Sequence, residues 1–104
     1  MNKTIFPLRS SDEQTATLPE QKQRTRRLPP FKVILHNDDV NTDIYVILVI
    51  QKLTPLEQAE AAEKTYEAHD TGQSVLLITN RERAELYVEQ FASCGLTVTC
   101  EPDA

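Results

Sequence analysis

Short apolar runs alternate with longer segments of helical periodicity between residues 31 and 102. Three of the runs are rich in β-branched residues and are bordered by Asn, Asp or Gly, a pattern that predicts strands. These predicted strands cover residues 31–35, 72–80 and 96–101. The chain between them is long enough to hold a helix in each gap.

The segment 81–95 predicts a helix, because its apolar residues follow the i, i+3, i+4, i+7 spacing of one helix face. That face is formed by Ala84, Tyr87, Val88 and Phe91. Thr79 or Asn80 is expected to cap the N-terminus of the helix. Gly95 is expected to end it.

The segment 54–72 carries the clearest helix boundaries in the chain. Thr54 and Glu57 have the spacing of a capping box, and Pro55 then falls at the first helical position. Gly72 follows the predicted end, where a left-handed residue often terminates a helix.

The run 44–50 is apolar at every position, and its β-branched residues favour a strand by propensity alone. The same stretch also contains one helix face, formed by Val46, Val49, Ile50 and Leu53. Asn41, Thr42 and Asp43 before it supply a cap and an acidic first turn. Periodicity leaves both structures open. A helix here gives the order β-α-α-β-α-β, an α+β fold with an antiparallel sheet covered by helices.

Charge divides the chain into two parts. Residues 1–30 have few large apolar side chains and a net charge of +3, whereas the remaining residues carry −8. A segment with so little apolar surface cannot offset its chain entropy by burial. We therefore predict a flexible basic extension over 1–30 and one folded core domain over 31–104.

Composition also excludes several function classes. The acidic core argues against nucleic-acid binding, and no apolar run approaches the roughly 18 residues of a membrane helix. Cys94 and Cys100 are predicted to be half-buried small hydrophobes in a reducing cytoplasm. No phosphate loop or paired metal-ligand spacing is present, so no enzyme activity, metal or cofactor is predicted. The residues whose side chains are of a kind that can ligate a metal are His36, Asp38, Asp39 and His69.

Five stretches resemble the ClpS family, whose members are adaptors of Clp ATP-dependent proteases. In chain order these stretches read "PPFKVILHNDD", "EAHDTG", "VLLIT", "RAELYVEQ" and "GLTVTCEP". The resemblance covers residues 29–102, and the combination of "NDD" with "H-x-x-G" is its most specific part. It implies a three-stranded antiparallel sheet packed against three helices, with a helix over 42–53.

The resemblance also implies a function, which is the capture of a substrate's free N-terminal amino group. The family's amine-binding residues fall on Asn37, Asp38 and His69. An ammonium group has three N–H donors, so three converging acceptors suit it. From the residues alone, these three also fit a turn, a helix cap and a helix end. The implied partners are N-degron substrates and the N-terminal domain of a Clp AAA+ ATPase, with the adaptor acting as a monomer.

The side-chain pocket implied by the family is altered in this chain. Its positions are Asp39, Asn41, Asp43, Val46, Thr65, Ala68 and Leu96. Asp43 and Thr65 replace methionines that are usual in the family, and Asn41 replaces a threonine. Two interpretations follow: specificity has moved towards polar or basic first residues, or amine capture has been lost and the domain is a scaffold.

The ATPase-binding face implied by the family is partly retained. Glu82 keeps the family's acidic residue, whereas Tyr87 stands where a lysine is usual. Tyr87 also belongs to the apolar face of its helix, so a place at the core edge remains an alternative.

Overall fold

The structure is a computed structural model that describes residues 28–103. Its elements in chain order are β1 (Phe31–His36), α2 (Asp43–Leu53), α3 (Gln58–Thr71), β2 (Gln73–Thr79), α4 (Arg81–Ser93) and β3 (Val98–Pro102). The predicted β-α-α-β-α-β order is confirmed. The predicted extension lies outside the described residues, apart from residues 28–30.

The three strands form one antiparallel sheet in the order β2-β1-β3, so β1 is the central strand. The register between β1 and β2 shifts between Val33 and Ile34, which pair with Leu77 and Val75. Leu76 is therefore the extra residue of a β-bulge, and it is buried. A bulge bends the strand that carries it, and here it allows neighbouring residues of β2 to face the core.

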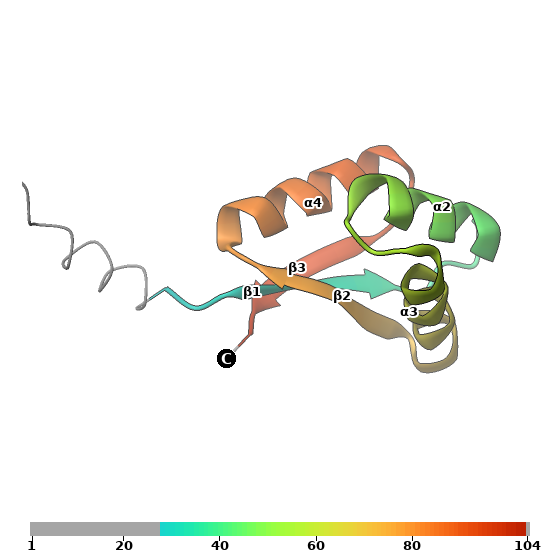
Figure 1. Ribbon diagram of the computed structural model, residues 1–104, viewed down its shortest axis with the longest axis horizontal. Helices are drawn as coiled ribbons and strands as arrows, with labels where there is room; N and C mark the ends of the chain where they lie inside the picture. Colours follow the sequence, from blue (N-terminus) through green and yellow to red (C-terminus); the bar gives the residue numbers. More distant parts are fainter. Residues whose placement is uncertain (1–27, 104) are drawn as a thin grey trace, which may run out of the picture.

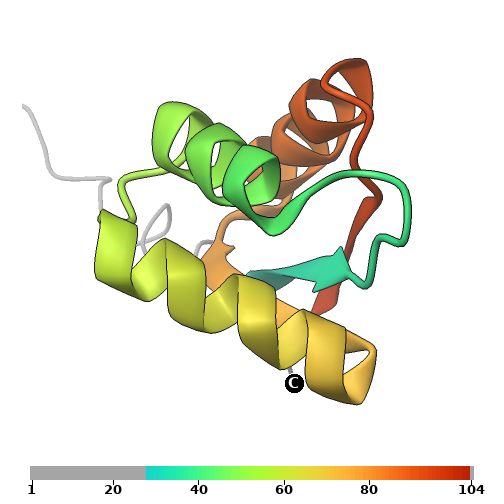
Figure 2. The ribbon, with the colours of Figure 1, turned by 90° about the vertical axis from the view of Figure 1, so that its right-hand side faces the viewer.

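Helices α2 and α4 lie along one side of the sheet, and α3 crosses the end at which β1 finishes (Figures 1 and 2). The core lies between these layers. Its largest fully buried side chains are Phe91, Leu35, Ile50 and Val33. The apolar face predicted for 81–95 supplies Phe91, so the helical spacing in that segment identified the core correctly.

The apolar run 44–50 is helical. Thr42 caps α2 by accepting a hydrogen bond from the Tyr45 N–H, and Asp43 occupies the acidic first turn. The buried residues of α2 are Val46, Val49 and Ile50. Ile44 and Leu48 remain 72% and 58% exposed, which shows that burial follows the helical face and not the whole apolar run.

The predicted capping box at the start of α3 is wrong. Thr54 is the C-cap of α2: its hydroxyl donates to the Ile50 carbonyl and accepts from the Leu56 N–H. Helix α3 begins at Gln58, after Glu57, which makes no side-chain capping bond. The chain reverses direction after α2, and Thr54 lies at this point. Its hydroxyl forms one hydrogen bond with a backbone group before it and one with a backbone group after it.

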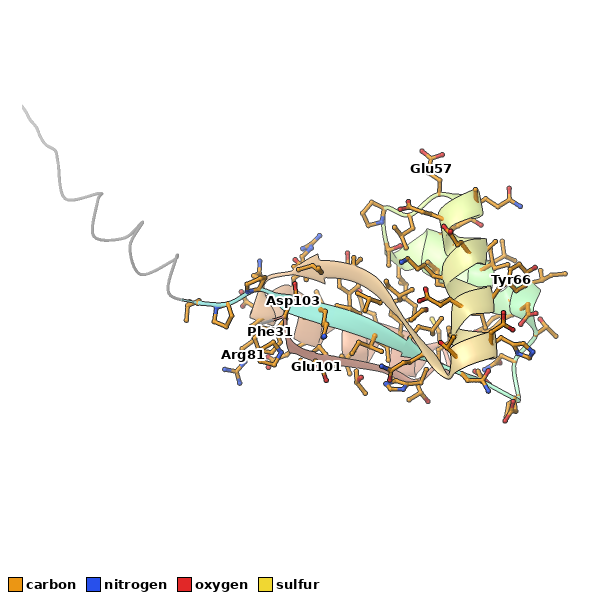
Figure 3. All side chains as sticks on the ribbon, turned by 90° about the horizontal axis from the view of Figure 1, so that it is seen from below. Phe31, Glu57, Tyr66, Arg81, Glu101 and Asp103 are labelled. Carbon is orange, nitrogen blue, oxygen red and sulfur yellow. The ribbon has the colours of Figure 1, made fainter. Side chains whose placement is uncertain are left out.

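The first residues of β1 are held at the end of the sheet away from α3. The Asp103 N–H donates to the Pro30 carbonyl at 2.9 Å, and the Arg81 guanidinium lies 5.8 Å from the centre of the Phe31 ring. Figure 3 shows Phe31, Arg81 and Asp103 together at this end. These contacts hold the start of β1 against the end of β3 and the start of α4.

Two further features concern the cysteines and the lengths of the helices. Cys94 and Cys100 are free and half-buried, and both pack against the core. Within residues 28–103, no helix is long and apolar enough to cross a membrane.

Candidate functional site

A small hollow lies where β1 ends, between the start of α2 and the end of α3. Its lining consists of Leu35, His36, Asn37, Asp38, Asp43, Val46, Thr65, Ala68 and His69. It holds about 230 Å³ of empty space, which includes open solvent, and its enclosed interior has room for about one water molecule. Seven of the predicted amine and pocket residues therefore meet in one place.

A glycine turn brings the end of α3 next to the segment after β1. Gly72 has a φ of 101°, in the left-handed region that glycine adopts without strain. Its carbonyl accepts a hydrogen bond of 3.0 Å from the Asn37 N–H. This bond fixes Asn37 beside the last turn of α3, which carries His69.

Asp38 is held as a carboxylate by its own loop. Its Oδ1 accepts from the N–H groups of Val40 at 2.8 Å and Asn41 at 3.0 Å, and its Oδ2 accepts from the Asn41 side chain at 2.6 Å. Desolvation raises the pKa of Asp38, but the hydrogen bonds from Asn41 and Val40 together lower it below its usual value of 3.8. The group is therefore charged at neutral pH.

Asn37 and His69 add acceptors to this charge. The Asn37 side chain donates from Nδ2 to Asp39 Oδ1 at 3.3 Å, which leaves its own carbonyl oxygen as an acceptor. His69 is exposed and lines the same hollow. A neutral imidazole has one acceptor nitrogen. A carboxylate, an amide oxygen and an imidazole thus surround one opening, which suits a small cationic donor.

The floor of the hollow is mostly apolar. Leu35, Val46 and Ala68 are all less than 5% exposed. Thr65 is 4% exposed and lies among them, with its hydroxyl donating to the Ala61 carbonyl at 2.8 Å. Asp43, at the start of α2, is exposed and lines the rim.

Three predicted pocket residues lie outside this lining. Asp39 is exposed beside Asn37, and Leu96 is 3% exposed within the core. Asn41 is half-buried and ties the loop that carries Asp38 to the end of α4, since its side-chain amide donates both to Asp38 and to the Gly95 carbonyl at 3.1 Å. We call this the bracing role of Asn41. A contact between residues so far apart in the sequence leaves no signal in the local sequence pattern.

Two residues of the lining, Leu35 and His36, were not predicted as part of the amine site or its pocket. They are the last two residues of β1 and directly precede Asn37. Their position at the end of a strand, immediately before the polar loop, is the signal that identifies them. The His36 ring shares a hydrogen bond of 2.8 Å with the Thr99 hydroxyl.

The predicted ATPase-binding residues differ in exposure. Glu82 is exposed in the first turn of α4, beside an open hollow that Arg83, Glu85 and Leu86 also line. Tyr87 is only 6% exposed and belongs to the core cluster. Tyr87 is therefore a core residue, whereas Glu82 is exposed to solvent.

Among residues 28–103, no group of three or more His, Cys, Asp and Glu side chains is placed to hold a metal ion. The hollow brings two histidines and two aspartates to one lining, yet they do not converge on a common point.

We expect Asn41→Ala to destabilise the fold by about 1–2 kcal/mol, because it removes hydrogen bonds to Asp38 and to the Gly95 carbonyl. The pKa of Asp38 should rise, since its side-chain donor is lost. Urea denaturation would measure the first effect, and NMR titration of the Asp38 carboxyl the second. Unchanged values in both experiments would contradict the bracing role.

Comparison with known proteins identifies the family. The family model described as ATP-dependent Clp protease adaptor protein ClpS matches residues 26–99. The ATP-dependent Clp protease adapter protein ClpS of Synechococcus elongatus is 37% identical over 91 residues, which is 86% of this chain and 96% of that protein. The ClpS of Gloeobacter violaceus is 40% identical over 90 residues, covering 86% and 97%.

A solved structure has the same fold. Agrobacterium tumefaciens ClpS2 bound to L-phenylalaninamide matches with a TM-score of 0.69 and 25% identity, covering 72% of this chain and 98% of the other. The fold, the family model and the sequence relatives agree. This chain belongs to the ClpS family of adaptor proteins for ATP-dependent Clp proteases.

Proposed function

We propose that this adaptor binds the free N-terminal amino group and first residue of substrates, and so selects them for a Clp AAA+ protease without catalysing a reaction itself. The observation that carries the proposal is the meeting of Asn37, Asp38 and His69 around one hollow. Each offers an acceptor to an ammonium group, and Asp38 adds the opposite charge.

The relative from Agrobacterium tumefaciens supports this proposal through its ligand. L-phenylalaninamide, to which that ClpS2 is bound, has a free α-amino group, one side chain and a neutral amide. Chemically it is the first residue of a peptide with the next peptide bond replaced by an amide. The free α-amino group of this ligand is the chemical group that the acceptors at the opening of the hollow suit.

The partner proposed for α4 is the N-terminal domain of the ATPase. Glu82 is exposed there beside Glu85 and Glu89, on a face that is separate from the hollow at the end of α3. Substrate capture and ATPase binding would then use different surfaces. We assign residues 1–30 to delivery of the captured substrate and not to capture.

Two versions of one peptide test the amine site. A fluorescently labelled peptide with a free N-terminus should bind, and the same peptide with an acetylated N-terminus should bind at least tenfold more weakly. Acetylation removes the charge and two of the three N–H donors, leaving acceptors without partners. Fluorescence anisotropy measures both affinities. Equal affinities would support a scaffold role and contradict amine capture.

Affinity for the free peptide should fall as the pH is lowered from about 7 to about 5. Histidine side chains as a class gain a proton between about pH 8 and pH 5, and a protonated imidazole has no acceptor nitrogen and repels an ammonium group. Asp38 does not oppose this trend, because its lowered pKa keeps it ionised at pH 5. Anisotropy titrations at several pH values would measure the slope.

The neighbouring His36 provides a matched control for the pH experiment. His69→Gln keeps an acceptor but cannot titrate, so the slope should flatten while binding at pH 7 is largely retained. His36→Gln removes the other histidine of the lining and should keep the slope of the wild type. A slope lost only in His36→Gln would remove His69 from the proposed site.

A further inference from the structure

The floor of the hollow contains one buried hydroxyl group, and its hydrogen already takes part in a hydrogen bond. Thr65 Oγ1 donates to the Ala61 carbonyl at 2.8 Å, and Thr65 is only 4% exposed. The oxygen keeps lone pairs and can therefore accept a hydrogen bond, but it has no second hydrogen to donate. The other floor residues, Leu35, Val46 and Ala68, have no polar side-chain atom.

The rim of the hollow also offers hydrogen-bond acceptors and no donors from its carboxylates. Asp43 lines the hollow at the start of α2, and Asp38 lines it after β1. An ionised carboxylate accepts hydrogen bonds and donates none. A side chain that enters between these groups is therefore favoured if it carries a donor, and disfavoured if it carries a negative charge.

The hollow is also small. Its enclosed interior has room for about one water molecule, and its floor is formed by side chains that are packed into the core. A large aromatic or branched side chain would have to displace Val46 or Ala68. Displacing packed core side chains is costly, and a short side chain requires less of this displacement than a large one.

From these three observations we infer that the pocket selects a short, uncharged first side chain that donates a hydrogen bond, as in Ser, Thr or Asn. The inference rests on the amine-binding function proposed above and names the substrate class of that site. Thr65 is the specificity-determining residue of the floor, and Asp43 excludes acidic first residues at the rim.

Matched peptide pairs that differ only in the first residue test the inference. Thr and Val have nearly the same shape, and only Thr donates a hydrogen bond. We expect the Thr-first peptide to bind about threefold to tenfold more tightly than the Val-first peptide. The Asn-first peptide should bind at least tenfold more tightly than its Asp-first counterpart. The Phe-first peptide should bind more weakly than the Thr-first peptide.

Two variants of the floor locate the effect. Thr65→Val keeps the shape of the floor without its hydroxyl, and the preference for Thr over Val should disappear. Thr65→Ser keeps the hydroxyl and should retain the preference. Equal binding of Thr-first and Val-first peptides by the wild-type protein would overturn the inference, as would a preference that survives in Thr65→Val or tightest binding of the Phe-first peptide.

The acetylated form of each peptide separates this inference from the proposed function. If acetylation abolishes binding but Thr and Val do not differ, amine capture stands and the specificity inference fails. If acetylation has no effect on any peptide, amine capture itself fails, and the specificity inference fails with it.

Discussion

Asp38→Ala should weaken the binding of a peptide with a free N-terminus by about a hundredfold. The substitution removes the negative charge that faces the ammonium group, and charge-assisted hydrogen bonds contribute about 1.5–3 kcal/mol each. It also removes the acceptor of the Val40 and Asn41 N–H groups, so the loop that carries Asn37 loses its internal bonds. Fluorescence anisotropy with one fixed peptide would measure the change.

Asp38→Asn separates the two parts of this effect. Its side-chain oxygen can still accept from the Val40 and Asn41 N–H groups, while the charge is gone. We expect binding about tenfold weaker than in the wild type, with the circular dichroism spectrum unchanged. Affinity within about twofold of the wild type in both variants would show that Asp38 only closes a turn.

Phe91→Ala should lower the free energy of unfolding by about 3–5 kcal/mol, because it leaves a cavity in the core. Phe91 is fully buried on α4, and its ring centre lies 6.5 Å from that of Tyr87. A domain of this size has about 5–15 kcal/mol of stability, so the loss is a large share of the total. Urea denaturation followed by circular dichroism would measure it.

Leu86→Ala is the matched control on the same helix. Leu86 is 46% exposed, so its truncation should cost less than about 1 kcal/mol. If the two variants were equally stable, α4 would not be packed through Phe91 as the structure shows. The comparison also bears indirectly on the burial of Tyr87, since the Tyr87 ring packs beside Phe91 and not at the surface.

The local features of the fold could be predicted because they depend on residues close in sequence. Asn80 caps α4 by accepting from the Arg83 N–H, three residues later. Gly72 and Gly95 have the positive φ values that their places after two helices predict. The apolar spacing in α4 likewise shows which face is buried, because one helix turn relates its members.

The candidate site could be predicted only in part. Asn37, Asp38 and His69 were predicted through the resemblance to a family, and the structure brings them to one hollow. The bracing role of Asn41 was not predicted, because Gly95 is 54 residues away in the sequence. The core position of Tyr87 was left open, because an apolar face of a helix does not show how deeply each of its members is buried.

The sequence by itself determined the strands, the ends of α3 and α4 at a glycine and the division into a basic segment and an acidic core. The residue pattern alone left strand and helix open for residues 44–50, since strand propensity and helical spacing compete in the same residues. The family resemblance implied the helix, and the tertiary structure shows why it forms. Packing of Val46, Val49 and Ile50 into the core favours the helix, because a strand would present alternate residues instead. Tertiary structure alone decided the size of the hollow, because β1, α2 and α3 each supply part of its wall.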